Sequence, residues 1–328
     1  PGDIGAVAKL SDTTTNDTLC DKDNPVTFEQ ISFPKGNYTM SVTPKSKADV
    51  DKMSSSLSKI VEEDSSIVLT REPDTGETLL SGLGDVHLDV AIQKIQRKFA
   101  AELVLNTPRV PYKETITSVF NAEYKHKKQS GGHGQYGHVN LRLEPTEKGE
   151  GFQFASEVVG GAVPKEYISS VEKGIVKALD DGIVAGYPVV DLKVVLYDGS
   201  YHDVDSSGIS FEIAASHAVR DGVRGANPSL LEPVMTIAVN VPDTFTGDVI
   251  GDINGKRGRI LGMVPEGGNT TIEAEVPQAE LLHYATELRS QTQGRGTYTA
   301  ELNKYEPVPF NIAQKLINQG DDAVDSEN

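Results

Sequence analysis

The alternation of hydrophobic and polar residues predicts a small α/β domain near the start of the chain. Residues 37–44 have the pattern of a strand, and residues 46–64 place apolar side chains on one face of an amphipathic helix. Residues 67–83 predict two strands joined by a Pro-Asp-Thr-Gly turn, followed by a helix over residues 84–100 and a strand over residues 101–106. This β-α-β-β-α-β order is that of a ferredoxin-like unit.

The same order of elements returns near the end of the chain. A strand is predicted over residues 234–242, a short helix over residues 246–258 and a hairpin over residues 259–277. A helix over residues 278–292 and a strand over residues 296–308 complete the unit. We therefore predict two ferredoxin-like domains that bracket a different middle region.

The middle region, about residues 107–231, is predicted to be a mixed α/β domain. Residues 112–129 and 138–148 have the pattern of extended strands. Helices are predicted over residues 163–186 and 210–226 from the spacing of their apolar positions. The whole chain is therefore predicted to be α+β.

A glycine-rich stretch, "KKQSGGHGQYGHVNLRL", lies between the two extended segments and contains the spacing G-x-G-x-x-G at Gly132, Gly134 and Gly137. A dinucleotide-binding loop needs a helix after these glycines, whereas Val139 and Leu141 continue with the period of a strand. A kinase glycine loop does join two strands, but no V-A-I-K, H-R-D or D-F-G motif follows it. Both nucleotide-binding interpretations therefore lack the context they require.

Three histidines in the same region, His126, His133 and His138, leave a metal site open as an alternative. No cysteine lies nearby and no acidic residue lies between them, so polar loop residues are the preferred interpretation and no metal ligand is assigned. A plain hairpin tip, in which glycine permits positive φ, is another alternative. A plain tip does not explain why residues 124–143 contain no acidic residue but four basic ones, Lys125, Lys127, Lys128 and Arg142. This local excess of basic residues favours contact with RNA.

The overall charge limits this interpretation. The 328 residues have a formal net charge of -17, which argues against binding nucleic acid by attraction to the protein as a whole. Any RNA binding would therefore depend on a local basic surface. The single cysteine, Cys20, excludes a disulfide framework and favours a reducing compartment, so we expect a cytoplasmic protein. No apolar run is long enough for a membrane span, and no membrane partner is expected.

Several long segments resemble elongation factor G, a bacterial translational GTPase. "KQSGGHGQYGHV" resembles the first tip loop of its domain IV, and "SGLGDVHLDV" resembles its domain III signature. "AGYPVVDLKVVLYDGSYHDVDSS" resembles a further part of domain IV, and "TGDVIGDINGKRGRILGM" resembles domain V. "GDIGAVAKLSDTTTNDTL" resembles the end of the β-barrel domain II, entered as strand, turn and strand.

The resemblance implies a domain order for the chain. The expected parts are the end of the β-barrel domain II over residues 1–32, a ferredoxin-like domain III over 33–106, a domain IV like ribosomal protein S5 over 107–231, a ferredoxin-like domain V over 232–308, and a C-terminal helix with an acidic disordered tail over 309–328. A chain that starts within a barrel is expected to be a fragment, and we expect it to be monomeric.

The resemblance also implies that domain IV enters the decoding region of the small ribosomal subunit while tRNA and mRNA move. Two tip loops would contact the tRNA–mRNA duplex and nearby rRNA. The first consists of Ser130, Gly131, Gly132, His133, Gly134, Gln135, Tyr136, Gly137 and His138. The second consists of Ser200, Tyr201, His202 and Asp203. These adjacent Ser, His and Asp residues are not a catalytic triad, whose members must meet in space.

The residue His133 departs from the family pattern, which usually has arginine there. Histidine replaces a permanent charge with one that titrates near neutral pH, so we expect a weaker phosphate contact and a steeper pH dependence.

In domain V the resemblance places Lys256 and Arg257 against large-subunit rRNA, and a solvated basic helix end is the alternative. The nearby G-x-x-G at 255–258 is typical of a KH domain, but a KH loop joins two helices and a hairpin is predicted here.

No G-x-x-x-x-G-K-[ST] occurs in the chain, so it contains no phosphate loop for GTP. We expect no catalytic site and no cofactor in this chain, and GTP with magnesium in a GTPase domain upstream. The expected function is GTP-dependent translocation on the ribosome, with rRNA of both subunits as partner. A paralogue that acts in ribosome recycling or ribosome protection, or a stand-alone RNA-binding module, remains an alternative.

Overall fold

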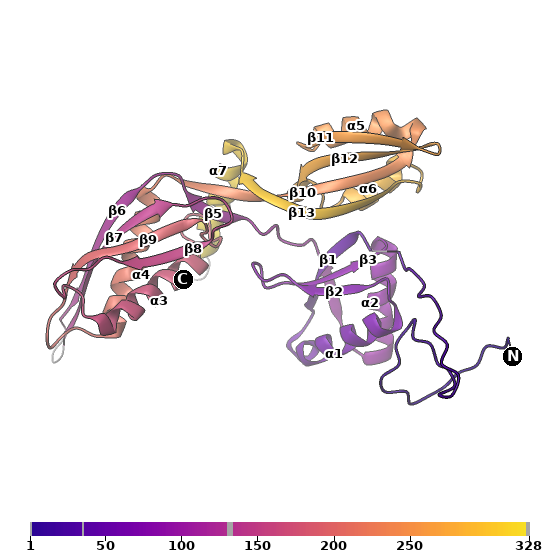
Figure 1. Cartoon of the computed structure of the whole chain (residues 1–328), viewed down its shortest axis with the longest axis horizontal. Coiled ribbons are helices and arrows are strands. Elements are labelled where there is room, and N and C mark those ends of the chain that lie inside the picture. Colours follow the sequence, from indigo (N-terminus) through magenta and orange to yellow (C-terminus); the bar gives the residue numbers. More distant parts are fainter. Residues whose placement is uncertain (1, 35, 130–133, 326–328) are drawn as a thin grey trace. The chain divides into compact units, whose positions relative to one another are not determined.

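The computed structural model describes residues 2–34, 36–129 and 134–325 (Figure 1). The chain divides into two compact units. Unit 1 comprises Pro1–Arg109 and Met235–Leu302, and unit 2 comprises Val110–Val234 and Asn303–Asn328.

The first described segment, residues 2–34, contains no helix or strand, so the strand–turn–strand predicted there is not formed. Within this segment Asn16 pairs with the backbone of Ile31, and its apolar side chains, such as Ile4 and Phe28, are exposed. A strand needs a neighbour for its backbone N–H and C=O groups, and none of the described strands pairs with this segment. No barrel is closed in the described part of the chain.

The first sheet of unit 1 confirms the ferredoxin-like order predicted near the start of the chain. Its antiparallel strands have the order β2-β3-β1-β4, so the first and third strands of the unit are neighbours at the centre. Leu57 and Ile60 of the first helix and Leu88 and Ile95 of the second are buried against the sheet. The elements are β1 (Tyr38–Pro44), α1 (Lys47–Glu63), β2 (Val68–Arg71), β3 (Thr78–Gly82), α2 (Asp85–Phe99) and β4 (Leu103–Asn106).

The second sheet repeats this arrangement, with strand order β11-β12-β10-β13. Its core contains Ile237, Val239 and Ile272 from the strands and Val249 and Leu288 from the helices. The predicted repeat of element order is therefore confirmed. The elements are β10 (Pro228–Pro242), η1 (Asp243–Phe245), α5 (Thr246–Gly255), β11 (Arg259–Glu266), β12 (Asn269–Pro277), η2 (Gln278–Glu280), α6 (Tyr284–Gln291) and β13 (Thr297–Pro307).

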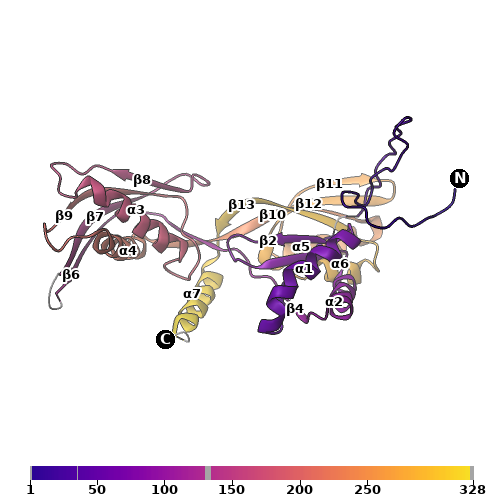
Figure 2. The same cartoon turned by 90° about the horizontal axis from the view of Figure 1, so that it is seen from below.

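Unit 2 contains a four-stranded sheet of order β6-β7-β9-β8, in which only β8 runs parallel to its neighbour. Helix α4 packs against β6 and β7, and α3 packs against α4 (Figure 1); Figure 2 gives a second view of these strands. Alternate residues of β7, Val139, Leu141 and Leu143, are fully buried on the helix side. The elements are β5 (Lys113–Ile116), β6 (Phe120–Lys128), β7 (Gln135–Pro145), β8 (Phe152–Ser156), α3 (Lys165–Asp180), β9 (Leu192–Ser200) and α4 (Gly208–Gly225).

A buried glutamate, Glu114 of β5, holds the loop that follows α3. Its side chain is fully buried and accepts four backbone N–H groups. Oε2 accepts from Ile183 at 3.0 Å and Val184 at 2.9 Å, and Oε1 accepts from Ala185 at 2.8 Å and Tyr187 at 3.1 Å. The carboxylate therefore replaces the water that these donors would otherwise need.

The last helix, α7 (Phe310–Asp325), continues into the acidic segment for which the sequence predicts a disordered tail. Extending a helix costs less free energy than starting one, so a helix that begins in the apolar first turns can extend through the acidic residues that follow. Among the residues that the structure describes, no helix is long and apolar enough to cross a membrane.

Candidate nucleic-acid interface

The glycine-rich stretch joins two antiparallel strands, β6 and β7. Their pairing extends to Lys128 opposite Gln135, so no helix follows the glycines and the dinucleotide-loop alternative is wrong. Four residues predicted for the first tip loop, from Gln135 to His138, lie within β7. Gly134 immediately precedes the strand, and Ser130, Gly131, Gly132 and His133 lie outside the described residues.

Two lysines of β6, Lys125 and Lys127, lie on the face of the hairpin that points away from α4. Tyr124 stacks on His217 of α4 with ring centroids 4.6 Å apart, so Lys125 and Lys127 point to the opposite face. Lys127 pairs with Tyr136 across the strands, and the Nζ atom of Lys125 lies 5.3 Å from the centre of the Tyr136 ring. Two exposed ammonium groups and an aromatic ring therefore share one face.

The second predicted loop lies beside this face. Ser200, the last residue of β9, pairs with His138 of β7. The Ser200 Oγ atom lies 2.8 Å from the Tyr136 hydroxyl and 2.8 Å from Nδ1 of His138. The Tyr136 and His202 rings are 6.3 Å apart. The structure therefore brings together residues of both predicted loops that are more than 60 positions apart in the sequence.

The two described histidines of the metal alternative are hydrogen-bonded within the protein. Nε2 of His126 lies 2.9 Å from Gln135 Oε1, and Nε2 of His138 lies 2.9 Å from Glu123 Oε1. The described residues contain no group of three or more His, Cys, Asp or Glu side chains that could hold a metal ion.

Two residues that the sequence did not single out, Asp205 and Ser206, connect the two loops. The backbone N–H of Tyr136 donates to the Asp205 carbonyl oxygen at 2.8 Å, and the N–H of Gly134 donates to Asp205 Oδ1 at 2.9 Å. The Ser206 hydroxyl donates to the Tyr136 carbonyl oxygen at 3.0 Å. No sequence pattern marks contacts between positions about 70 residues apart.

Gly137 is required by close packing and not by its backbone conformation. A Cβ atom at this position would lie 2.6 Å from the carbonyl oxygen of Ser210, at the start of α4. Neither Gly137 nor Gly134 has positive φ. The sequence predicted a need for glycine because of positive φ, whereas the structure requires glycine at 137 because the Ser210 backbone lies so close.

The two basic residues predicted in the C-terminal domain are both paired with carboxylates. The Lys256 Nζ atom lies 3.2 Å from Asp252 and 2.7 Å from Glu287, and its side chain is 18% exposed. Burial lowers the pKa of Lys256, but hydrogen bonds to Glu287 and Asp252 outweigh it, and the net shift is upward. Arg257 Nε bonds Glu280 at 2.8 Å. These contacts favour a structural contribution by both cations.

The G-x-x-G of the same region joins helix α5 to strand β11, so the KH context is absent.

Comparison with known protein families gives one consistent result over most of the chain. The family models match in order: "Elongation Factor G, domain III" over residues 33–107, "Elongation factor G, domain IV" over residues 108–227, and "Elongation factor G C-terminus" over residues 229–316.

The chain belongs to the elongation factor G family.

A solved structure supports this assignment. The crystal structure of a protein from Thermus thermophilus is similar to this chain with a TM-score of 0.78 and 40% sequence identity. The match covers 93% of this chain and 46% of the Thermus protein, so this chain spans less than half the length of that relative.

In the elongation factor G nomenclature, the β6–β7 hairpin and the β9–α4 loop belong to domain IV. The connection between β6 and β7, together with the β9–α4 loop, is called the tip below. The described residues of the tip are Gly134 to His138 and Ser200 to Ser206. The adjacent Ser200, His202 and Asp203 do not meet as a triad, because Ser200 contacts Tyr136 and His138 while Asp203 is exposed; Ser200, His138 and Glu123 instead form a hydrogen-bonded chain.

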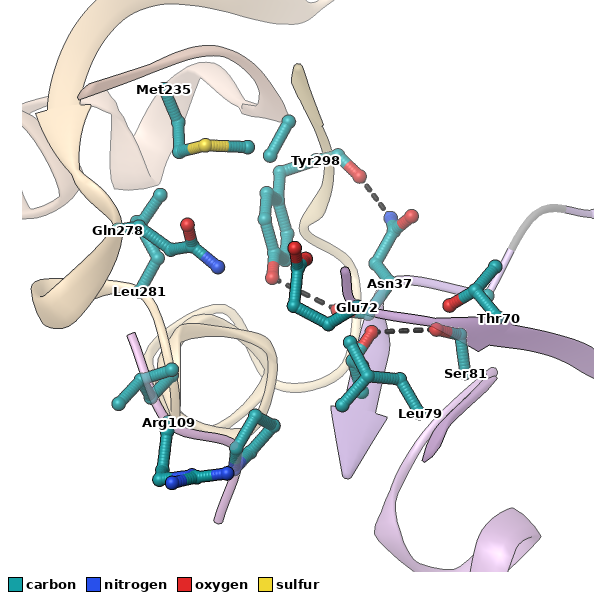
Figure 3. Close-up of a pocket in the computed structure, with 15 residues that line it drawn as sticks. Asn37, Thr70, Glu72, Leu79, Ser81, Arg109, Met235, Gln278, Leu281 and Tyr298 are labelled. Atoms are coloured by element: carbon teal, nitrogen blue, oxygen red, sulfur yellow. Dashed lines mark hydrogen bonds between the residues drawn. The ribbon is translucent and has the colours of Figure 1, made fainter. Parts of the chain in front are cut away.

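Unit 1 contains a cavity of about 290 Å³, lined by residues of domain III and of the C-terminal domain (Figure 3). Several of its polar side chains are hydrogen-bonded within the protein. The Tyr298 hydroxyl donates to the Asn37 carbonyl oxygen at 3.0 Å, and the Asn37 amide donates to the Tyr298 carbonyl oxygen. The hydroxyls of Thr39 and Ser81 lie 2.7 Å apart. Burial raises the pKa of Tyr298 to about 12, consistent with a phenol held in its neutral form.

Proposed function

We propose that this chain is the part of a translocation factor that binds the ribosome, and that the tip of domain IV contacts RNA while tRNA and mRNA move. The observation that carries the proposal is the meeting of the two predicted loops at Ser200, beside the Lys125–Tyr136 face. Membership of the elongation factor G family supports action on the ribosome, and the side chains of the tip support contact with RNA.

Each group on this face suits RNA rather than a protein surface. The ammonium groups of Lys125 and Lys127 can pair with phosphates, and the rings of Tyr136 and His202 can stack on unpaired bases. The segment from 124 to 143 contains no acidic residue in a protein with a net charge of -17. Carboxylates from outside the segment pair with His138 and Arg142, so the basic part of this face is the end that carries Lys125 and Lys127. Contact with RNA is therefore local, through the tip.

Energy for directed movement has to come from outside this chain, since its sequence contains no phosphate loop. We propose that the three domains act together with a GTPase domain that binds GTP and magnesium. Isothermal titration calorimetry of this chain with GTP and magnesium should give no binding heat; measurable binding contradicts this part of the proposal.

The function is tested by single-round translocation on reconstituted ribosomes with the complete factor. Replacing Lys125 and Lys127 together by Gln removes two phosphate partners and is expected to slow translocation about tenfold. The matched control is Lys173→Gln, which removes an exposed charge from α3 and should leave the rate unchanged. An unchanged rate in the double variant contradicts the proposal. A parallel subunit-splitting assay separates translocation from ribosome recycling, the alternative within the family.

A further inference from the structure

We propose that Asp205 is a positioning residue that holds the start of β7 in place for the tip. The proposal rests on the proposed function of domain IV and adds a residue that neither predicted loop includes. Asp205 lies in the β9–α4 loop and bonds the other loop twice, through its side chain to Gly134 and through its carbonyl oxygen to Tyr136.

The need for such a residue follows from where β9 ends. The β7–β9 pairing finishes at His138 opposite Ser200, whereas β7 begins three residues earlier, at Gln135. The first residues of β7 therefore have β6 on one side and no strand on the other, and their outward backbone groups need partners.

The β9–α4 loop supplies those partners. N–H groups two residues apart point the same way in a strand, and the loop accepts both, from Gly134 and from Tyr136. Ser206 forms a parallel bridge with Tyr136 and donates its hydroxyl to the Tyr136 carbonyl oxygen. The loop thus acts as a short substitute strand, and of its bonds to this end of β7 only the one to Gly134 uses the Asp205 side chain.

The Asp205 backbone also fixes the tip histidine. Its N–H donates to Nδ1 of His202 at 3.3 Å, as does the N–H of Val204 at 3.4 Å, so the ring nitrogen is an acceptor here. The His202 N–H donates to the Ser206 hydroxyl at 2.9 Å. The Tyr136 and His202 rings, which would contact RNA, are therefore placed relative to each other by the backbone of one loop.

Loss of the carboxylate leaves the Gly134 N–H without its acceptor and frees the residue just before β7, whereas the bonds between Tyr136 and the loop remain. The RNA-contacting groups remain present but are held less firmly, and part of their ordering has to occur on the ribosome. Because the tip is a small part of a chain of three domains, the expected effect is on the rate of translocation at saturating factor and not on affinity for the ribosome.

The structural half of the proposal is tested on this chain by amide hydrogen exchange measured by NMR. In Asp205→Ala the Gly134 amide should exchange at least about tenfold faster, while the core amide of Val194 keeps its protection. Asp205→Asn retains one oxygen acceptor and should give a smaller change. Asp180→Asn, an exposed acid on α3, is the matched control and should change neither amide. Unchanged Gly134 exchange in Asp205→Ala overturns the proposal.

The functional half uses the complete factor in the translocation assay. Asp205→Ala should lower the saturated rate about tenfold with less than about a twofold change in the half-saturating concentration, and Asp205→Asn should recover part of the rate. If Gly134 loses protection and translocation is unchanged while the Lys125 and Lys127 double variant is slow, the positioning role is overturned and the proposed function stands. If the double variant is also unaffected, the proposed function itself fails, and the positioning role fails with it.

Discussion

The hydroxyl groups of Tyr136 and Ser200 lie 2.8 Å apart and join β7 to β9 where β9 ends. Both residues belong to segments predicted as separate RNA-contacting loops, and His138 shares the same Ser200 hydroxyl. The described residues of the tip of domain IV are therefore joined by one hydrogen-bond network. A change in either loop is expected to reach the other.

The buried carboxylate of Glu114 should be essential for the stability of unit 2. Glu114→Ala leaves four backbone N–H groups buried without an acceptor, and a loss of about 3–5 kcal/mol in the free energy of unfolding is expected. Urea denaturation followed through the amides of residues 183–187 measures it. Glu172→Gln, an exposed position on α3, should change stability by less than about 0.5 kcal/mol. Equal stability of the two variants would show that the Glu114 contacts contribute nothing.

The glycine at 137 should tolerate no side chain. In Gly137→Ala the new Cβ would meet the Ser210 carbonyl group at 2.6 Å, so α4 and β7 must separate, at a cost of about 1–3 kcal/mol. Gly247→Ala is the matched control, because a Cβ there meets nothing within 4 Å in helix α5 and should stabilise slightly. Thermal unfolding of the two variants measures the difference, and a stable Gly137→Ala variant is the contrary result.

Alkaline pH should weaken unit 1 through Tyr298. Its pKa is raised by burial from 10.0 to about 12, so between these values the unfolded chain has lost a proton that the folded chain keeps. Stability is therefore full below pH 10 and falls by about 1.4 kcal/mol per pH unit up to pH 12.

Tyr298→Phe removes this proton and should flatten the dependence above pH 10, although the lost bond to Asn37 lowers stability at neutral pH. Burial also raises the pKa of Tyr284, so some alkaline slope remains in the variant. Urea denaturation from neutral pH to about pH 11.5 gives both slopes. Tyr201→Phe, at an exposed tyrosine, serves as the control and should leave the slope unchanged. Identical slopes in the wild type and Tyr298→Phe would contradict the assignment.

Periodicity predicted the sheets and helices well, because each buries one apolar face and leaves a clear pattern along the chain. It failed for residues 2–34, where apolar residues alternate but none of the described strands pairs with them. The family resemblance placed Gln135–His138 in a tip loop, whereas these residues lie in β7 and pair with β6. The contacts of Asp205 and Glu114 join distant parts of the chain and leave no local signal.

The central claim is that the tip of domain IV lies against RNA of the decoding region, and directed hydroxyl-radical probing tests it most directly. The complete factor carries Lys127→Cys with Cys20→Ser, so that this segment has one thiol, to which an iron chelate is attached. On ribosomes stalled during translocation, the account predicts cleavage of small-subunit rRNA in the decoding region. A matched chelate at Lys173→Cys on α3 should give a different, weaker pattern there. No cleavage of decoding-region rRNA from position 127 on ribosomes that have bound the factor would contradict the account.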